Sequence, residues 1–334
     1  MLIDLLLPPQ MNRRSFNKSL AYAAIGLPLI GPAKCATAFK SSNQYGSKDT
    51  PYKWSLAQWS LHRTFESGDQ PILDFSKIAA RLGFTGVEYV SQLYSGLLAK
   101  SSSQLQGMKR LANDLTIRAD DNQVSNLLVM IDGEGDLAIS DPAQRAINIS
   151  NHHKWVDLIS EIGGHAIRVN LFGEGSREEM HDASVVALTA LGKYAKDQGV
   201  SILVENHGGY SSDPYWLVDI MEKVDMTNVG LLPDFGNFCL RREDGSRWGS
   251  PCADEYPDKV GAIKMMIPYC QGISAKSYAF DNDGNETTLP YPEIIKVIQA
   301  SNYDGYIGVE YEGQAPEEEG ISATLNLLKR LTNQ

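Results

Sequence analysis

The chain has 334 residues, of which 43% are hydrophobic and 21% are charged, and this length suits one large domain or two small ones. The formal net charge is −11, and because residues 1–38 contribute +3, the remainder carries −14. Such an acidic body repels nucleic-acid backbones and anionic membranes, and no basic cluster after residue 40 exceeds Arg241-Arg242, so we expect neither partner.

Residues 1–38 carry the features of an export signal rather than of a folded segment. The run Asn12-Arg13-Arg14-Ser15-Phe16-Asn17-Lys18 resembles a twin-arginine signal, an apolar stretch follows over 20–30, and Ala36-Thr37-Ala38 is a small-x-small cleavage pattern. The apolar stretch is short and interrupted by glycine and proline, so we expect no stable membrane insertion, although an uncleaved interfacial anchor is the alternative. We predict a twin-arginine signal peptide over 1–38 (starting at Met1 or Met11), a linker over 39–52 and a periplasmic location.

From residue 54 onward, strand patterns and helix patterns alternate. Nearly continuous apolar runs indicate buried strands, and apolar residues at 3.6-residue spacing indicate helices. The predicted strands cover 54–62, 84–90, 124–131, 165–171, 200–205, 229–233, 272–278 and 306–311. The predicted helices cover 72–82, 104–115, 141–162, 177–198, 215–224, 256–269, 291–300 and 317–331.

Eight strands, most of them followed by a helix, are typical of an α/β protein with a (β/α)8 TIM barrel, which we predict over 53–334. A doubly wound open sheet is the rival fold, but no Gly-x-Gly-x-x-Gly motif follows the first strand. A weak internal echo between 83–89 and 304–311 also suits a barrel built from repeated units.

A long polar insertion covers 239–255, directly after the sixth predicted strand. This position would allow the insertion to act as a lid. Cys239 and Cys252 could form a disulfide across it in an oxidising compartment. Together with Cys270, these scattered cysteines form neither a disulfide framework nor a zinc-binding pattern.

Charged side chains stand at the carboxyl ends of four successive predicted strands. Glu205 ends the fifth strand, Asp234 the sixth and Glu310 the eighth, and Lys276 lies late in the seventh. Barrel enzymes build their active sites at this end, so we expect these side chains to converge there. Three adjacent carboxylates repel one another, and a divalent cation or the lysine would offset their charge.

Further side chains are candidates for substrate contact, with core packing or a structural salt bridge as the alternative. His207 shares a strand face with Glu205 and adjoins a glycine pair where a ligand could approach. The other candidates for substrate contact are His62, Glu88, Arg168 and Asn170. Trp59, Trp216, Phe238 and Tyr278 could stack on a sugar face. We expect His152 and His153, within a predicted helix, at the surface.

In order and spacing, four segments over about 54–330 resemble the sugar phosphate isomerase/epimerase family with its xylose isomerase-like barrel. They are Gly83-Phe84-Thr85-Gly86-Val87-Glu88-Tyr89, Val204-Glu205-Asn206-His207-Gly208-Gly209, Pro233-Asp234-Phe235-Gly236-Asn237 and Gly308-Val309-Glu310-Tyr311-Glu312-Gly313. The resemblance implies that Glu205, Asp234 and Glu310 bind a divalent metal ion, namely Mn, Mg, Zn or Co.

One position departs from the family pattern. Members with a four-ligand site usually carry a histidine two residues before a lysine on the seventh strand, and here Ser274 precedes Lys276 in that place. Serine is a poor metal ligand. Therefore His207 or water completes the site, or metal binding is weak, or Lys276 takes the place of the cation.

The expected function is isomerisation or epimerisation of a small unphosphorylated carbohydrate by metal-assisted proton transfer through an enediolate. Glu205 and Glu310 would move the proton, and Lys276 is the third catalytic candidate. A lyase or hydratase acting on a keto-sugar glycoside and a non-catalytic sugar-binding barrel are the alternatives. The sequence is compatible with a homo-oligomer and does not identify the sugar.

Overall fold

The structure, a computed structural model, describes residues 52–334, and the predicted signal peptide and nearly all of the predicted linker lie outside them. Eight parallel strands form one sheet in the order β6-β5-β4-β3-β2-β1-β10-β9. Parallel bridges from Leu231 to Cys270 and from Asp234 to Ser274 join the two end strands and close the barrel. The strands are β1 Lys53–Ala57, β2 Gly86–Val90, β3 Ser125–Met130, β4 Ala166–Val169, β5 Ser201–Glu205, β6 Val229–Leu232, β9 Ile273–Ser277 and β10 Tyr306–Tyr311.

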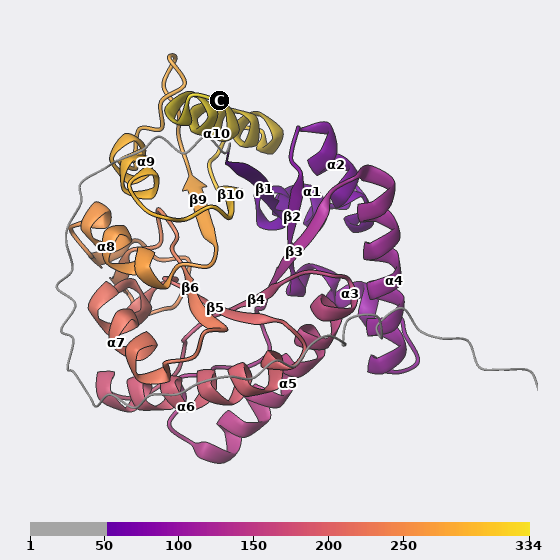
Figure 1. Cartoon of the computed structure of the whole chain (residues 1–334), viewed down its shortest axis with the longest axis vertical. Coiled ribbons are helices and arrows are strands. Elements are labelled where there is room, and N and C mark those ends of the chain that lie inside the picture. Colours follow the sequence, from indigo (N-terminus) through magenta and orange to yellow (C-terminus); the bar gives the residue numbers. More distant parts are fainter. Residues whose placement is uncertain (1–51) are drawn as a thin grey trace, which may run out of the picture. The chain divides into compact units, whose positions relative to one another are not determined.

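Helices surround the strands on the outside of the barrel, as Figure 1 shows. They are α1 His62–Ser67, α2 Phe75–Arg81, α3 Ser95–Leu98, α4 Gln104–Asn122, α5 Pro142–Glu161, α6 Arg177–Lys196, α7 Pro214–Val224, α8 Lys259–Met266, α9 Tyr291–Gln299 and α10 Glu317–Thr332. None of the helices within residues 52–334 is long and apolar enough to cross a bilayer. The predicted (β/α)8 fold is confirmed.

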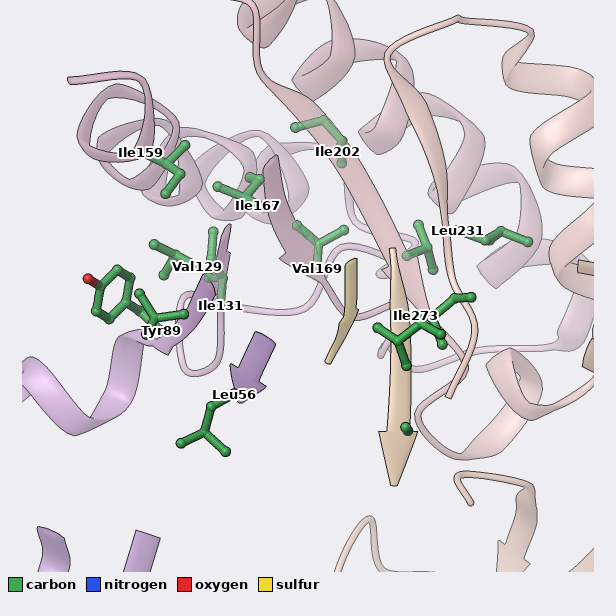
Figure 2. Packing of buried hydrophobic residues seen from close by; sticks show 14 of the residues in the cluster. Leu56, Tyr89, Val129, Ile131, Ile159, Ile167, Val169, Ile202, Leu231 and Ile273 are labelled. Atoms are coloured by element: carbon green, nitrogen blue, oxygen red, sulfur yellow. The ribbon is translucent and has the colours of Figure 1, made fainter. Parts of the chain in front are cut away.

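The strands separate two apolar layers because alternate side chains face opposite sides of a strand. Val129 of β3 and Ile167 of β4 belong to the large layer between strands and helices, where Ile159 of α5 also packs (Figure 2). The barrel interior holds a much smaller apolar cluster: Ala57, Val90, Leu128, Met130, Ala166, Leu203 and Leu232. The alternation that turns Leu203 inward also turns Glu205 inward, so the interior becomes polar toward its carboxyl end.

A glycine makes room for a carboxylate inside the barrel. A Cβ atom at Gly308 of β10 would lie 2.5 Å from Oε1 of Glu88 on β2, which is too close for two such atoms. Glu88 is 3% exposed, and its Oε1 accepts a 2.6 Å hydrogen bond from the Ser55 hydroxyl. The glycine two residues before Glu310 therefore allows Glu88 to point into the interior.

Some predicted boundaries differ from the structure. The strand predicted over 54–62 ends at Ala57, and a 3₁₀ turn over Gln58–Leu61 leads into α1. The buried Gln58 explains the turn, because its side chain accepts from the Val90 amide and donates to the Tyr94 hydroxyl. The helix predicted over 104–115 continues to Asn122, and the helix predicted over 256–269 is shortened to α8.

The polar insertion folds into a hairpin of two antiparallel strands, β7 Cys239–Arg242 and β8 Cys252–Glu255, separate from the barrel sheet. A disulfide joins Cys239 to Cys252, so the predicted bridge is confirmed. We call residues 239–255 the hairpin.

Candidate active site

Three carboxylates converge at the carboxyl end of the barrel. One oxygen from each of Glu205, Asp234 and Glu310 lies within 4.8 Å of the others. All three side chains are buried, at 3% exposure or less. Burial raises the pKa of each carboxyl group, to about 8 for Asp234, and repulsion by neighbouring carboxylates adds to this effect. The sequence prediction that these residues come together is confirmed by their geometry.

The carboxylates have more hydrogen-bond acceptors than nearby donors. The Ser274 hydroxyl lies 2.6 Å from Oδ2 of Asp234 and 2.8 Å from Oε2 of Glu310, but it has one proton to donate. Oε2 of Glu205 has no hydrogen-bond partner within residues 52–334. The Arg168 guanidinium, whose Nε lies 2.8 Å from Oε2 of Glu205, offsets part of the carboxylate charge, and the remainder needs a proton or a further cation. A hard divalent cation therefore fits this donor set.

Lys276 is a buried cation beside the cluster. Its ammonium group lies 2.9 Å from Oε1 of Glu312 and 3.6 Å from Oε2 of Glu310. Burial alone would lower the pKa of Lys276, but these two carboxylates raise it well above the usual value. Lys276 therefore remains charged. Glu312 was not predicted, although its place two residues after Glu310 on the same strand face could have indicated it.

A hydrogen-bonded network lies on the other side of Glu205. Nε of Arg168 is 2.8 Å from Oε2 of Glu205, an ionic contact whose N–H does not point at the oxygen. Nη1 of Arg168 donates to Oδ1 of Asp132 at 3.1 Å, and the Asn170 amide donates to the same oxygen at 2.6 Å. Nδ1 of His207 lies 2.8 Å from the Asn170 side-chain oxygen, so we assign the proton to Nδ1.

This assignment leaves Nε2 of His207 as a free acceptor. Burial, with a contribution from Arg168, lowers the pKa of His207 to about 3, so the ring is neutral. Nδ1 of His207 lies 4.0 Å from Oε2 of Glu205. Within residues 52–334, the atoms close enough together to hold a metal ion come from Glu205, Asp234 and Glu310, and His207 is not among them. The geometry thus places His207 at the edge of the carboxylate cluster.

Two predicted contact residues lie away from the open cavity. Glu88 sits deeper in the barrel, where its Oε2 has no hydrogen-bond partner among residues 52–334 and burial raises its pKa to about 8. The ring of His62 stacks on Trp59, with centroids 4.5 Å apart, and its Nδ1 is 2.7 Å from the Trp59 carbonyl oxygen. Trp59 lines the cavity and His62 does not.

The cavity above the carboxylates has a volume of about 770 Å³. Of the predicted site residues, its lining includes Arg168, Asn170, His207, Lys276 and Glu310. Trp59 and Tyr278 also line it, whereas Trp216 and Phe238 are buried in the core. His152 is 3% exposed and lines the cavity, so its predicted surface position is wrong. The α5 face that carries His152 turns inward, where its ring bonds to the Asn148 carbonyl oxygen.

The comparison with protein families agrees with this fold. Residues 76–331 match the family described as Xylose isomerase-like TIM barrel. The chain belongs to that family.

Two curated relatives match over shorter stretches. The C-glycoside deglycosidase alpha subunit of Arthrobacter globiformis is 32% identical over 65 residues, which are 20% of this chain and 18% of that protein. An inosose dehydratase of Clostridium perfringens is 26% identical over 146 residues, which are 40% of this chain and 48% of that protein. The chain thus spans less than half the length of the relatives it matches.

Solved structures share the fold over most of the barrel. D-psicose 3-epimerase in the presence of D-fructose is 14% identical, covers 84% of this chain and 100% of its own, and has a TM-score of 0.61. A Xylose isomerase-like TIM barrel protein from Mycobacterium smegmatis in complex with magnesium is 17% identical, covers 84% and 97%, and has a TM-score of 0.57. At these identities the likeness shows the fold alone.

Proposed function

We propose that this chain is a sugar isomerase or epimerase that moves a proton on a small carbohydrate. The convergence of Glu205, Asp234 and Glu310 beneath a cavity of about 770 Å³ carries this proposal. The volume falls within the range of about 300–1,000 Å³ typical of small-molecule sites. Sugar epimerases among the structural neighbours support a carbohydrate as the substrate.

We propose that Glu205, Asp234 and Glu310 hold a divalent cation. Oε2 of Glu205, which accepts no hydrogen bond from residues 52–334, supports this role, and an all-oxygen donor set suits magnesium or manganese better than zinc or cobalt. The magnesium complex of a family member also supports it. When bound, the cation supplies a Lewis acid that polarises a sugar carbonyl and an adjacent hydroxyl.

In this proposal Glu205 and Glu310 act as the base and the acid. One carboxylate removes the proton from the carbon next to the carbonyl, and the C–H electron pair forms the C=C bond of an enediolate. The other returns a proton to the neighbouring carbon, giving isomerisation, or to the opposite face of the same carbon, giving epimerisation. A carboxylate placed at the reacting carbon can take up a proton as a base and return it as an acid.

The remaining cavity residues orient the substrate and hold charge. Lys276 keeps an ammonium group beside Glu310 and can donate to a substrate oxygen. His207 offers Nε2 to a sugar hydroxyl, and Arg168 and Asn170 hold Glu205 and His207 in place. Glu88 and His62, which belong neither to the cavity lining nor to the carboxylate cluster, act through their neighbours.

A lyase or hydratase acting on a keto-sugar glycoside is the second candidate. Loss of a substituent from the carbon adjacent to the same enediolate requires no further base. Two observations favour it: the charged Lys276 inside the cavity, and relatives named as a dehydratase and a deglycosidase.

Proton exchange with solvent tests the proposal. We would incubate the metal-loaded protein in D₂O with D-fructose, D-psicose or D-tagatose and follow carbon-bound deuterium by mass spectrometry. We expect incorporation with the parent and with Glu318→Gln, a surface control paired to Arg81, but not with Glu205→Gln or Glu310→Gln. Exchange that persists in both cluster variants, or sugar binding with no exchange in the parent, would contradict the proposal.

We also propose that residues 1–38 direct export to the periplasm by the twin-arginine route. The Cys239–Cys252 disulfide supports an oxidising compartment. Fractionation of cells that express the full chain tests this, with Arg13→Lys combined with Arg14→Lys as the variant. Equal recovery of parent and variant in the periplasm would contradict it.

A further inference from the structure

The hairpin over 239–255 contributes nothing to the barrel sheet. Its second strand, β8, is exposed along its whole length, and the first, β7, is at most half-buried. It begins directly after the segment that carries Asp234. The hairpin is held together by a disulfide, packs little against the core and lies beside the carboxylate cluster. We therefore ask whether it contributes to substrate binding rather than to the stability of the barrel.

The tip of the hairpin is fastened over the cavity by Arg247. Its guanidinium makes two bonds to the Asp136 carboxylate in the loop after β3, at 3.0 and 2.7 Å. The same group lies 4.2 Å from the centroid of the Phe172 ring in the loop after β4. Bidentate pairing and ring stacking give a guanidinium a defined orientation. The tip is therefore held in one position between two loops of the barrel mouth.

Next to Arg247, Trp248 turns an indole ring toward the cavity. The ring is 47% exposed, lies 4.7 Å from the His207 ring and meets the Phe172 ring edge-on at 5.4 Å. It lines the same cavity as Glu310 and Lys276. A half-exposed indole in a wall of polar and charged groups offers a flat apolar surface, which matches the C–H face of a sugar ring.

A second indole borders the same cavity from another side. Trp59 follows β1 and is held by its stack on His62, whereas Trp248 packs on His207, which follows β5. Strands β1 and β5 are four places apart in an eight-stranded closed sheet, which puts them on opposite sides of the barrel. The cavity thus lies between two aromatic surfaces.

We propose that the hairpin is a preorganised substrate-binding wall and that Trp248 stacks on the apolar face of a pyranose ring, opposite Trp59. This rests on the proposed carbohydrate function and narrows it to substrates that bind as a closed six-membered sugar ring, with a carbonyl that is either a ketone on the ring or exposed when the ring opens. The disulfide and the Arg247–Asp136 pair fix the wall before the substrate arrives, so binding loses less conformational entropy.

Isothermal titration calorimetry tests whether the hairpin binds a sugar ring, under conditions in which no reaction takes place. The probes are methyl β-D-glucopyranoside, methyl β-D-galactopyranoside and methyl α-D-mannopyranoside, which cannot open. All measurements are made in the Glu205→Gln background with EDTA present. We expect at least one probe to bind, Trp248→Ala to weaken that binding by about tenfold or more, and Trp248→Phe to retain most of it.

Control variants distinguish a specific loss of pyranoside binding from a general loss of folding. Tyr215→Ala removes another exposed aromatic ring, 64% exposed on α7 and outside the cavity lining, and should bind as the parent does. Arg247→Gln should weaken binding while the barrel keeps its thermal unfolding midpoint. The Cys239→Ser/Cys252→Ser double variant should weaken binding while far-ultraviolet circular dichroism shows that the barrel is still folded. The inference is overturned if no pyranoside binds, if Trp248→Ala binds as tightly as the parent, or if Tyr215→Ala loses as much.

The binding experiment and the proton-exchange experiment can fail independently of each other. Pyranoside binding without proton exchange in the parent would refute the isomerase mechanism and leave the wall in place. Proton exchange into D-fructose with no pyranoside binding would refute the wall alone.

Discussion

Replacing Glu88 by glutamine should stabilise the protein in a pH-dependent way. Glu88 is a carboxyl group with one hydrogen-bond donor, the Ser55 hydroxyl, and an Oε2 atom without a partner in the described barrel. Glutamine keeps the shape and the oxygen that accepts from Ser55. It removes the negative charge that would otherwise form inside the barrel beside Glu310 and Glu205.

The magnitude follows from the pKa. Burial raises the pKa of Glu88 from 4.5 to about 8, and at 1.36 kcal/mol per unit this amounts to roughly 5 kcal/mol. Because the folded pKa lies above the unfolded one, the folded state binds the proton more tightly. The stabilisation from Glu88 is therefore fully present below about pH 4.5 and is lost as the pH rises to about 8. Glutamine does not titrate and shows no such loss.

Urea unfolding followed by circular dichroism, with EDTA present, measures the effect. Parent and Glu88→Gln should have similar free energies of unfolding near about pH 5, and the variant should gain a few kcal/mol by about pH 8. Glu318→Gln, at the surface, should give a nearly constant difference from the parent. A Glu88→Gln difference that stays flat over this range would refute the assignment of Glu88 as a buried acid with a raised pKa.

Three further substitutions probe the surroundings of the cluster. Lys276→Met leaves the Glu312 and Glu310 carboxylates without their cation and should destabilise the protein by about 3–5 kcal/mol, with partial recovery in MnCl₂; a melting midpoint equal to the parent's would contradict this. Ser274→His supplies an imidazole ligand and should tighten Mn²⁺ binding by about tenfold or more in calorimetry, whereas unchanged affinity would place position 274 outside the metal site. Gly308→Ala should cost about 1–3 kcal/mol in urea unfolding, and less in a Glu88→Ala background; equal costs in both backgrounds would show that the Cβ and the Glu88 carboxylate do not compete.

Most of what the sequence predicts about the carboxylate cluster follows from the two-residue periodicity of the strands. Side chains two residues apart share a strand face, and the carboxyl ends of parallel strands meet at one end of a barrel. These two rules suffice to bring Glu205, Asp234 and Glu310 together and to place Lys276 beside them. Applied one step further, the first rule would also have found Glu312.

The hairpin contacts could not be predicted in this way. Residues 239–255 show no hydrophobic period, and the Arg247–Asp136 pair joins residues 111 positions apart through the shapes of two loops. The same holds for His62, whose place behind Trp59 depends on a 3₁₀ turn that the buried Gln58 side chain stabilises. Cavity walls built from loops depend on tertiary contacts that local sequence patterns do not encode.

Metal content tests the central claim most directly. We would measure Mg, Mn, Zn and Co by mass spectrometry in the purified parent, in Glu205→Gln and Glu310→Gln, and in Glu318→Gln as the control. A carboxylate-held cation predicts close to one divalent ion per chain in the parent and the control, and almost none in the two cluster variants. A parent that stays free of metal after loading with Mn²⁺ or Mg²⁺, or cluster variants that retain the full amount, would contradict it.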